Sequence, residues 1–344
     1  MRRSVLACCA LLLAAASCGS EPTPAGPAVL VIQDGSVPDA REVVSPAVLA
    51  AEAALQERGL RAVIADTGGL GGETLRIARE GADDPAIVGV IVAPFTWLPV
   101  EARDELLAAG LGVVSLSSTA PGIARGAAWR RLVPDVEDEA VALLQTTTGA
   151  IPCVAGEGTA ASRALTSAVQ AAGGPNVRSL GGPPAVAAAL AGPEGCTGVI
   201  WTGSAPGAIA FRDGLAVPIP IALGAAARTA VYLETGWPAG EGTVGICGCA
   251  DLTTSAGPDA QEIVHAYQSS TGLDPGPFAV EGADAVALLI GSGETVSRDG
   301  VRARLAATTE WDGAVTRYAW NAGGEPDPPP LRIYEARGVR WLPS

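Results

Sequence analysis

The chain has 344 residues, enough for about two domains at roughly 100–200 residues each. Hydrophobic residues make up 48% of it, which suits packed cores and excludes a disordered chain. The net charge is −14, and adjacent basic residues occur only at Arg2–Arg3 and Arg130–Arg131. A protein that binds a phosphate backbone needs a basic face, so nucleic acid is excluded as a main partner.

The first 27 residues have the pattern of an export signal and a tether. Two arginines precede an apolar run, Val5–Ala16, which is too short to span a bilayer but fits a signal peptide. The small residues Ala15-Ala16-Ser17 before Cys18 resemble a bacterial lipobox, in which the cysteine is acylated. We therefore expect a signal peptide over residues 1–17 and a lipidated Cys18 that begins a Pro-rich tether over residues 18–27. Cleavage without lipid is the alternative. The mature protein would be extracytoplasmic and lipid-anchored to a bacterial cell membrane.

Apolar runs of strand length alternate with amphipathic stretches from Ala28 onward. Because the runs are continuously apolar, they indicate strands buried on both faces of a parallel sheet. Ser45 and Pro46 have the pattern of an N-cap and a first helical residue. The expected elements are strands at Ala28–Gln33, Leu60–Ala65, Ile87–Val92 and Gly112–Ser115, and helices at Ala47–Arg58, Glu73–Ala82 and Val100–Ala109.

The same alternation of strands and helices then begins again. Strands are expected at Ile151–Ala155, Val177–Leu180, Gly198–Thr202, Ile219–Leu223 and Val244–Cys247, with helices at Asp135–Gln145 and Ala160–Ala172. Three helices follow without a strand between them, at Asp259–Ser270, Ala279–Ile290 and Arg298–Ala307, before strands at Thr316–Trp320 and Leu331–Tyr334. Two consecutive series predict an α/β fold of two doubly wound parallel-sheet lobes.

Four cysteines remain after the signal peptide and Cys18: Cys153, Cys196, Cys247 and Cys249. Four cysteines allow three pairings. Outside the cytoplasm an even set favours disulfides. The alternative is a metal site on Cys247-Gly248-Cys249, but that spacing is tighter than zinc sites use. We expect no metal and no cofactor.

Several sequence motifs, in their order along the chain, resemble those of type I periplasmic binding proteins, particularly the leucine/isoleucine/valine-binding group of ABC-importer receptors. The resemblance covers residues 28–340. Its landmarks are Asp66-Thr67-Gly68-Gly69, Gly112–Thr119, Arg130–Asp135, Glu281–Val286, and Thr316–Trp320 followed by Asn321–Gly324.

The resemblance implies two lobes that the chain joins by three hinge crossings. The hinges would lie near Val133–Asp135, Ala250–Leu252 and Gly313–Val315. Lobe one would then comprise residues 28–133 and 252–313, and lobe two residues 134–251 and 314–344. The implied 2-1-3-4-5 strand order places Cys153 beside Cys196, so we expect that bridge. Cys247 and Cys249 would form a local and less secure pair.

The ligand is expected between the lobes, outside the carboxyl ends of the strands. Hydroxyls of Ser117, Ser118 and Thr119 can bind a carboxylate through hydrogen bonds. The resemblance gives this role to their segment and to Thr96. A turn that only caps its own backbone is the alternative. Trp97 is a candidate cleft wall, or else a core tryptophan. The further candidates are Asp34, Ser204 and Ala225.

Two segments depart from the pattern of amino-acid receptors. Those receptors hold the ligand ammonium with acidic and aromatic residues of lobe two. Here Gly203-Ser204-Ala205 and Gly224-Ala225-Ala226 carry neither a charge nor a ring. Either Asp34 or Glu157 substitutes from another loop, or the ligand is a small carboxylate, an amide or another polar metabolite. The second alternative is favoured slightly.

Catalytic patterns are scarce. No Gly-x-Ser-x-Gly elbow and no phosphate loop occurs, and the lone histidine, His265, lies in an expected helix. We therefore expect no enzyme, but a monomeric solute-binding lipoprotein that captures a small polar ligand for an ABC permease. A ligand sensor or a cell-envelope regulatory lipoprotein on the same fold is the alternative.

Overall fold

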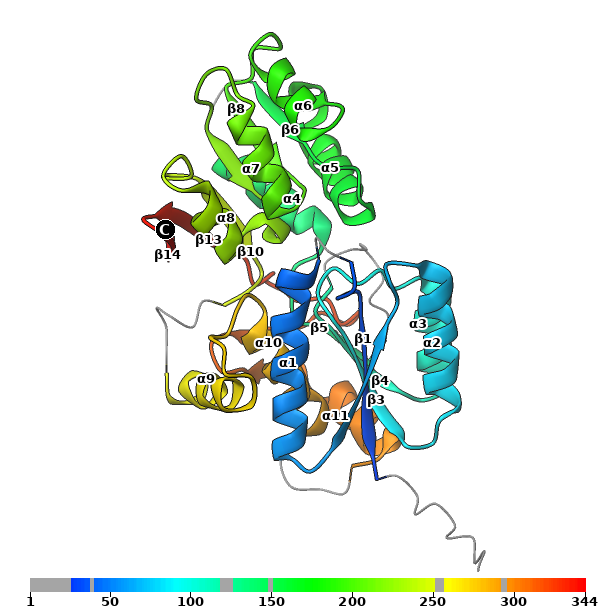
Figure 1. Ribbon diagram of the computed structural model, residues 1–344. Coiled ribbons are helices and arrows are strands. Elements are labelled where there is room, and N and C mark those ends of the chain that lie inside the picture. The colour runs from blue at the N-terminus through cyan, green and yellow to red at the C-terminus, as the bar shows by residue number, and fades with distance from the viewer. Residues whose placement is uncertain (1–25, 38–39, 118–125, 148–150, 251–256, 292–295) are drawn as a thin grey trace, which may run out of the picture.

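The structure is a computed structural model that describes residues 26–37, 40–117, 126–147, 151–250, 257–291 and 296–344. The expected signal peptide, Cys18, Ser118 and Thr119 lie outside these residues. Figure 1 shows two lobes, one above the other, with the chain passing between them several times. In the described part of the chain, no helix is both long enough and apolar enough to cross a membrane.

The first lobe is built on a five-stranded parallel sheet in the order β2-β1-β3-β4-β5. Its central strands are continuous Val/Ile/Leu runs, which is why both of their faces are buried. The strands are β1 (Ala28–Gln33), β2 (Arg61–Asp66), β3 (Ile87–Val92), β4 (Gly112–Ser115) and β5 (Trp129–Arg131). The helices are α1 (Arg41–Glu57), α2 (Gly71–Asp83), α3 (Val100–Ala108), α9 (Pro258–Thr271), α10 (Ala279–Ile290) and α11 (Arg298–Ala307).

The second lobe is built on a seven-stranded sheet in the order β14-β13-β10-β9-β8-β6-β7. Its first five strands in the chain are parallel, and β13 and β14 add an antiparallel hairpin at one edge. The strands are β6 (Pro152–Ala155), β7 (Arg178–Leu180), β8 (Gly198–Trp201), β9 (Ile221–Leu223), β10 (Val244–Cys247), β13 (Arg332–Arg337) and β14 (Arg340–Pro343). The helices are α4 (Val136–Thr146), α5 (Ala160–Gly173), α6 (Pro184–Ala191), α7 (Ala205–Asp213) and α8 (Ala230–Gly236), with short 3-10 turns at Gly174–Asn176 and Ala225–Ala227.

Alternate residues of each strand serve opposite layers of helices. In β1, Leu30 packs with Ile77 of α2 and Leu106 of α3, whereas Val29 and Val31 belong to the core on the α1 and α10 side. Successive side chains of a strand point to opposite faces. Each sheet is therefore covered by helices on both faces, the three-layer arrangement of a doubly wound fold (Figure 1). The predicted fold class is confirmed.

The prediction for the start of the first helix was wrong. Helix α1 begins at Arg41, and Pro46 lies inside it rather than at its first position. Val43 and Val44, ahead of the proline, are almost completely buried. Because a proline lacks an N–H, it removes one helical hydrogen bond, and the burial of these two valines maintains the helix despite that loss.

The last crossing between the lobes also differs from the expected hinge at Gly313–Val315. Strand β12 (Arg317–Ala319) pairs with β11 (Glu310–Asp312) in a separate two-stranded sheet. The indole Nε1 of Trp320 donates to the Arg131 carbonyl at 2.6 Å, and the amide of Arg131 donates to the Gly324 carbonyl at 3.0 Å. These bonds hold residues 316–324 against the first lobe, so the chain enters the second lobe only between Gly324 and β13.

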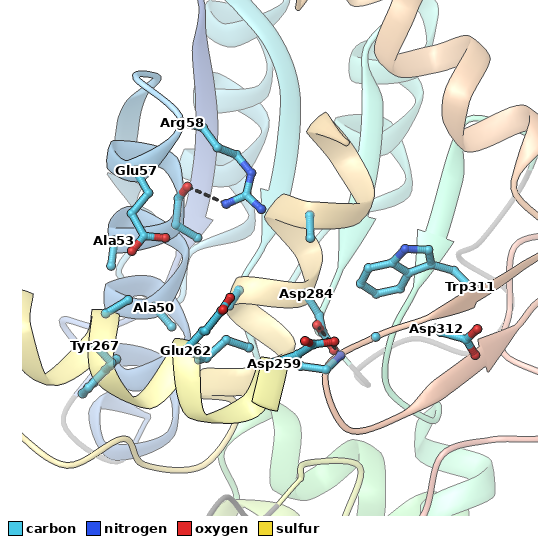
Figure 2. A pocket seen from close by; sticks show the side chains of 17 residues that line it. Ala50, Ala53, Glu57, Arg58, Asp259, Glu262, Tyr267, Asp284, Trp311 and Asp312 are labelled. Carbon is cyan, nitrogen blue, oxygen red and sulfur yellow. Dashed lines mark hydrogen bonds between the residues drawn. The ribbon is translucent and has the colours of Figure 1, made fainter. Parts of the chain in front are cut away.

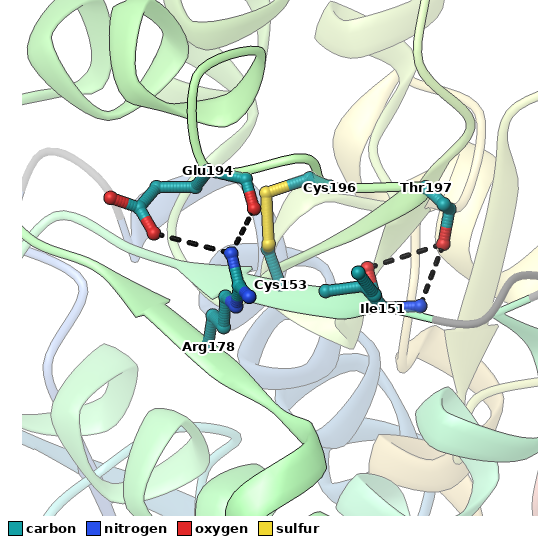
Figure 3. The surroundings of a disulfide bond; sticks show 6 residues. All are labelled: Ile151, Cys153, Arg178, Glu194, Cys196 and Thr197. Carbon is teal, nitrogen blue, oxygen red and sulfur yellow. Dashed lines mark hydrogen bonds and ion pairs between the residues drawn. A yellow bond between two sulfur atoms is a disulfide. The ribbon is translucent and has the colours of Figure 1, made fainter.

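The second lobe contains two disulfides in the expected pairing. Cys153 of β6 is joined to Cys196, with their Cα atoms 5.7 Å apart, and Cys247 is joined to Cys249, with Cα atoms 5.0 Å apart. Figure 3 shows Arg178 beside the first bridge, in an ion pair with Glu194 at 3.4 Å. The bridge and these contacts tie the loop before β8 to the neighbouring strands β6 and β7.

We predict that replacing Cys153 and Cys196 with alanine lowers the free energy of unfolding by about 4 kcal/mol, because the bridge closes a loop of 43 residues. The same change at Cys247 and Cys249, which are 2 apart, should cost about 1 kcal/mol in the same chain-entropy treatment. Urea unfolding of both double variants measures the two losses. Non-reducing peptide mapping checks the pairing, and four free thiols in the exported protein would contradict it.

Candidate functional site

Two of the cavities in the described part of the chain are similar in volume. One, of about 270 Å³, lies on the flank of the first lobe among α1, α9, α10 and the β11 region (Figure 2). The other, of about 260 Å³, lies between the lobes. The contacts of their polar side chains distinguish a structural cavity from a candidate binding site.

The flank cavity contains acidic side chains whose main contacts are structural. Asp284 of α10 is buried; its Oδ1 accepts the Ala314 amide at 3.0 Å, and its Oδ2 accepts the Tyr318 hydroxyl at 3.3 Å. Arg58 turns back along α1 and donates to the Ala54 carbonyl at 2.9 Å (Figure 2). Burial raises the pKa of Asp284 to about 7. Asp284 therefore attaches the β11–β12 hairpin to α10, and we assign it a structural role.

The inter-lobe cavity lies where the strands of both sheets end. The first lobe contributes residues after β1, β2 and β3, and the second contributes residues after β6, β8 and β9. This is the place where doubly wound sheets bind ligands. Its lining residues are Asp34, Val37, Ala40, Val43, Gly68, Gly69, Phe95 and Trp97 from the first lobe, and Glu157, Thr159, Ala160, Ala161, Ser162, Thr202, Gly203, Ser204 and Ala226 from the second.

Asp34 is the polar centre of the first-lobe wall. It follows β1 directly and is 5% exposed. Its Oδ1 accepts the hydroxyl of Thr67, and its Oδ2 accepts the Trp97 amide at 3.3 Å. Burial raises the pKa of Asp34, although these hydrogen bonds act in the opposite direction. The carboxyl group therefore links the loops after β1, β2 and β3 at one point of the cleft.

Glu157 organises the opposite wall. Its Oε1 accepts the Ser204 hydroxyl and its Oε2 accepts the Ser204 amide, both at 2.7 Å. Ser204 is also the N-cap of α7. A Cβ at Gly203 would lie 2.7 Å from Glu157 Oε2, and one at Gly207 would overlap Glu157 Oε1. Glycine at both positions therefore gives the carboxylate room to connect the loops after β6 and β8.

Two aromatic rings of one loop add an apolar wall. Phe95 follows β3 with a positive φ of 58°, a conformation that is uncommon for a bulky residue. Its ring meets Phe278 edge to face, with centroids 5.9 Å apart. Trp97 is 39% exposed, and its carbonyl accepts the Thr74 hydroxyl at 3.2 Å. Packing thus holds Phe95 in a strained conformation at the cavity, while the Trp97 ring remains accessible to a ligand.

A hydroxyl cluster forms the second-lobe part of the cavity wall. Thr202 Oγ1 lies 3.1 Å from Ser162 Oγ and 2.8 Å from Thr166 Oγ1, and it also donates to the Ala155 carbonyl at 3.1 Å. Ser162 Oγ accepts the Glu157 amide at 3.1 Å. The hydroxyls therefore form a connected network at the start of α5 and the end of β8.

The structure brings together some of the predicted site residues and separates others from the cavity. Asp34, Trp97 and Ser204 line it. Thr96 and Ser117 are buried outside the lining, where the Ser117 hydroxyl donates to the Thr96 carbonyl at 3.0 Å. Ala225 is likewise buried outside it. The roles proposed for Ser118 and Thr119 fall on residues outside the described ones.

Sequence reasoning did not single out Phe95, Ser162 and Thr202 as site residues. Phe95 lies in the loop that follows β3, and the position of that loop could be predicted from the sequence. Ser162 lies inside α5, and its approach to Thr202, 40 residues further along the chain, depends on the pairing of β6 with β8. The strand ends could therefore have predicted Phe95, whereas the contact of the two hydroxyls needed the tertiary structure.

The described lining is acidic. Asp34 and Glu157 are its charged residues, and no arginine or histidine is among those that the structure describes there. Polar hydroxyls and two aromatic rings complete it. Such a wall suits hydrogen-bond donors and cationic groups, together with an apolar body against the rings.

Comparison with solved structures identifies the fold. An ABC transporter substrate-binding protein from Desulfitobacterium hafniense, in complex with leucine, is 18% identical, has a TM-score of 0.70 and aligns over 93% of this chain and 100% of its own. A possible leucine/isoleucine/valine-binding protein from Rhodopirellula baltica is 11% identical, with a TM-score of 0.76 over 94% and 98% of the two chains. A solute-binding protein from R. palustris, in complex with benzoate, is 15% identical, with a TM-score of 0.72 over 92% and 95%.

No protein-family model matches the sequence, and neither does any curated protein sequence. The fold is nevertheless the one that these substrate-binding proteins have, as the resemblance predicted. The similar structures belong to substrate-binding proteins of transporters rather than to enzymes.

We predict that Asp284→Asn flattens the dependence of stability on pH. The unfolded chain releases this proton near pH 3.8, whereas the folded protein holds it to about pH 7. The folded state therefore binds more protons between these values, and stability falls as the pH rises through them. Urea unfolding at several pH values should show a slope that is shallower in the variant by at most about 1.4 kcal/mol per pH unit. The exposed Asp83→Asn is the control, and an unchanged slope in Asp284→Asn would contradict the assignment.

Proposed function

We propose that this protein captures a small polar ligand between its two lobes and delivers it to an ABC importer. The observation that supports this most strongly is the cavity at the facing strand ends, to which both lobes contribute polar side chains. Asp34 in one wall and Glu157 in the other are each held by hydrogen bonds within their own lobe. A ligand that contacts both walls would favour the closed arrangement of the lobes.

The size of the cavity limits the ligand. About 260 Å³ is below the usual range of roughly 300–1,000 Å³ for pockets that hold drug-sized molecules. Proteins with this fold are known in complex with leucine, isoleucine and benzoate, all small molecules. The proposed ligand is therefore a metabolite of that size, with polar groups for the carboxyls and hydroxyls and an apolar part for Phe95 and Trp97.

The proposed location is outside the cytoplasm. Two disulfides in one lobe fit an oxidising compartment. Cys18 would carry the lipid, and the described fold begins at β1 only ten residues further along the chain. A protein of net charge −14 gains little attraction from anionic headgroups, so the acyl chains would provide the membrane attachment.

Trp97→Ala should weaken ligand binding about five- to thirtyfold, because it removes an aromatic wall worth roughly 1–2 kcal/mol. A thermal-shift panel of α-amino acids, carboxylates, amides and amines first finds the binders, and calorimetry then compares the variant with the wild type. Trp237→Ala is the matched control, since Trp237 is 38% exposed and Trp97 39%, but Trp237 is not part of the cavity lining. A panel that produces no stabilisation, or equal losses in both variants, would count against the inter-lobe site.

Cys18→Ala should move the protein from the membrane fraction to the soluble extracytoplasmic fraction. The variant lacks the thiol that would be acylated, and the acidic protein has no other attachment in this proposal. Fractionation followed by immunoblotting measures the change. Ser20→Ala alters the same tether and should stay in the membrane fraction. A membrane-bound Cys18→Ala protein would refute the lipid anchor while leaving ligand capture untouched.

A further inference from the structure

A small side chamber adjoins the inter-lobe cavity. It has a volume of about 20 Å³, which is enough for one water-sized group. Four residues line both spaces, namely Phe95, Ala161, Thr202 and Ala226. The remaining lining of the chamber is Val136, Glu139, Ala164 and Leu165. One small polar group of a ligand in the main cavity could therefore extend into this chamber.

Glu139 is the ionisable group of that chamber. It lies on α4 and is 4% exposed, and its Oε1 accepts the Ala225 amide at 2.8 Å. Among the described residues, the hydrogen bond from Ala225 is the one that this carboxyl group makes, and it leaves Oε2 free of such a bond. A Cβ at Gly224 would lie 3.0 Å from Glu139 Oε1 and 2.8 Å from Leu165 Cδ2. Glycine at this position therefore leaves room for a carboxyl from α4 to reach the loop after β9, which has no acidic side chain of its own.

The surroundings of Glu139 favour its neutral form. Burial raises its pKa to about 7, and the hydrogen bond from Ala225 lowers it only in part. Strands β9 and β10, which pack against α4, carry no charged residue, and Arg163 of α5 bonds to the Gly158 carbonyl.

The other charged groups near α4 are acidic or already engaged. On α4 itself, Glu137 is exposed and Asp138 interacts electrostatically with Arg131. Asp34 and Glu157 face the adjoining cavity. A cation that entered the chamber would thus meet a carboxyl group with no basic partner among the described residues.

We propose that the side chamber is an ammonium subsite and that the ligand is a small organic amine without a carboxylate, whose ammonium group pairs with Glu139. The proposal rests on the proposed function. A carboxylate on the ligand would be repelled by Asp34 and Glu157, which line the same cavity. The apolar body of the amine packs against Phe95 and Trp97. When the ammonium enters, Glu139 releases its proton to solvent and becomes the carboxylate of the ion pair.

Matched pairs of small molecules test which sign of charge on the ligand the site binds. Benzylamine and benzoate have nearly the same shape with opposite charges, and 3-methylbutylamine is leucine without its carboxylate. Calorimetry on the full-length exported protein should detect binding of the two amines and at least a hundredfold weaker binding of benzoate and leucine. Binding of benzoate or leucine without the amines overturns the amine subsite and leaves the proposed function standing. Binding of none of the four overturns the amine subsite, and only an unresponsive wider panel refutes ligand capture itself.

The pH dependence tests the role of Glu139. With a group that titrates near pH 7, 3-methylbutylamine should bind about tenfold more tightly at pH 8 than at pH 6, because the amine keeps its proton over this range as lysine does. Calorimetry in two buffers of different ionisation enthalpy should show proton release at pH 6.

Glu139→Gln keeps the size of the side chain and an acceptor for the Ala225 amide. It should lose at least tenfold in amine affinity at pH 8 and show no proton release at pH 6. Glu137→Gln removes the same charge from an exposed position of α4 and should behave like the wild type. Circular dichroism and a melting curve establish that both variants fold. A folded Glu139→Gln protein that retains the full pH dependence would overturn the assignment.

Discussion

The ends of parallel strands are the constraint on which the structure depends. A parallel sheet directs all its carboxyl ends to one edge, so each lobe gathers its strand-to-helix loops at a single rim. The rims of the two lobes face each other across the inter-lobe cavity. Asp34 connects three loops of one rim, and Glu157 connects two loops of the other. The same carboxyl groups thus organise the rims and determine the charge of the cavity wall.

The acidic groups at the described cavity come from outside the two segments at which the resemblance implies them. The segments Gly203–Ala205 and Gly224–Ala226 have no charge of their own, yet both receive a carboxyl from elsewhere in the second lobe. Glu157 bonds to Ser204, and Glu139 bonds to the amide of Ala225. The sequence left open whether Asp34 or Glu157 substitutes as the partner of an ammonium group. The structure places both in the cavity wall, and it adds Glu139 in the adjoining chamber, which the sequence did not indicate.

One ion pair with a buried arginine holds the region where the chain passes between the lobes. Arg131 at the end of β5 is completely buried, and its guanidinium lies 2.8 Å from the carboxylate of Glu325, which is 20% exposed. Removing one partner of such a pair leaves an uncompensated buried charge and is costly. Trp320 bonds to the carbonyl of the same arginine. This cluster fixes residues 316–324 to the first lobe, so the chain enters the second lobe only after them.

The sequence by itself determined the two series of buried strands, the helices between them and the edge at which a ligand would lie, because these follow from local apolar patterns and strand direction. It also placed Asp34, Trp97 and Ser204 at strand ends, and the structure puts them in the cavity. Only the tertiary structure decided that Glu139 reaches the loop after β9, that Ser162 meets Thr202, and that residues 316–324 stay with the first lobe. Each of these contacts joins residues 40 or more positions apart, and such pairings depend on how whole elements pack rather than on any local pattern.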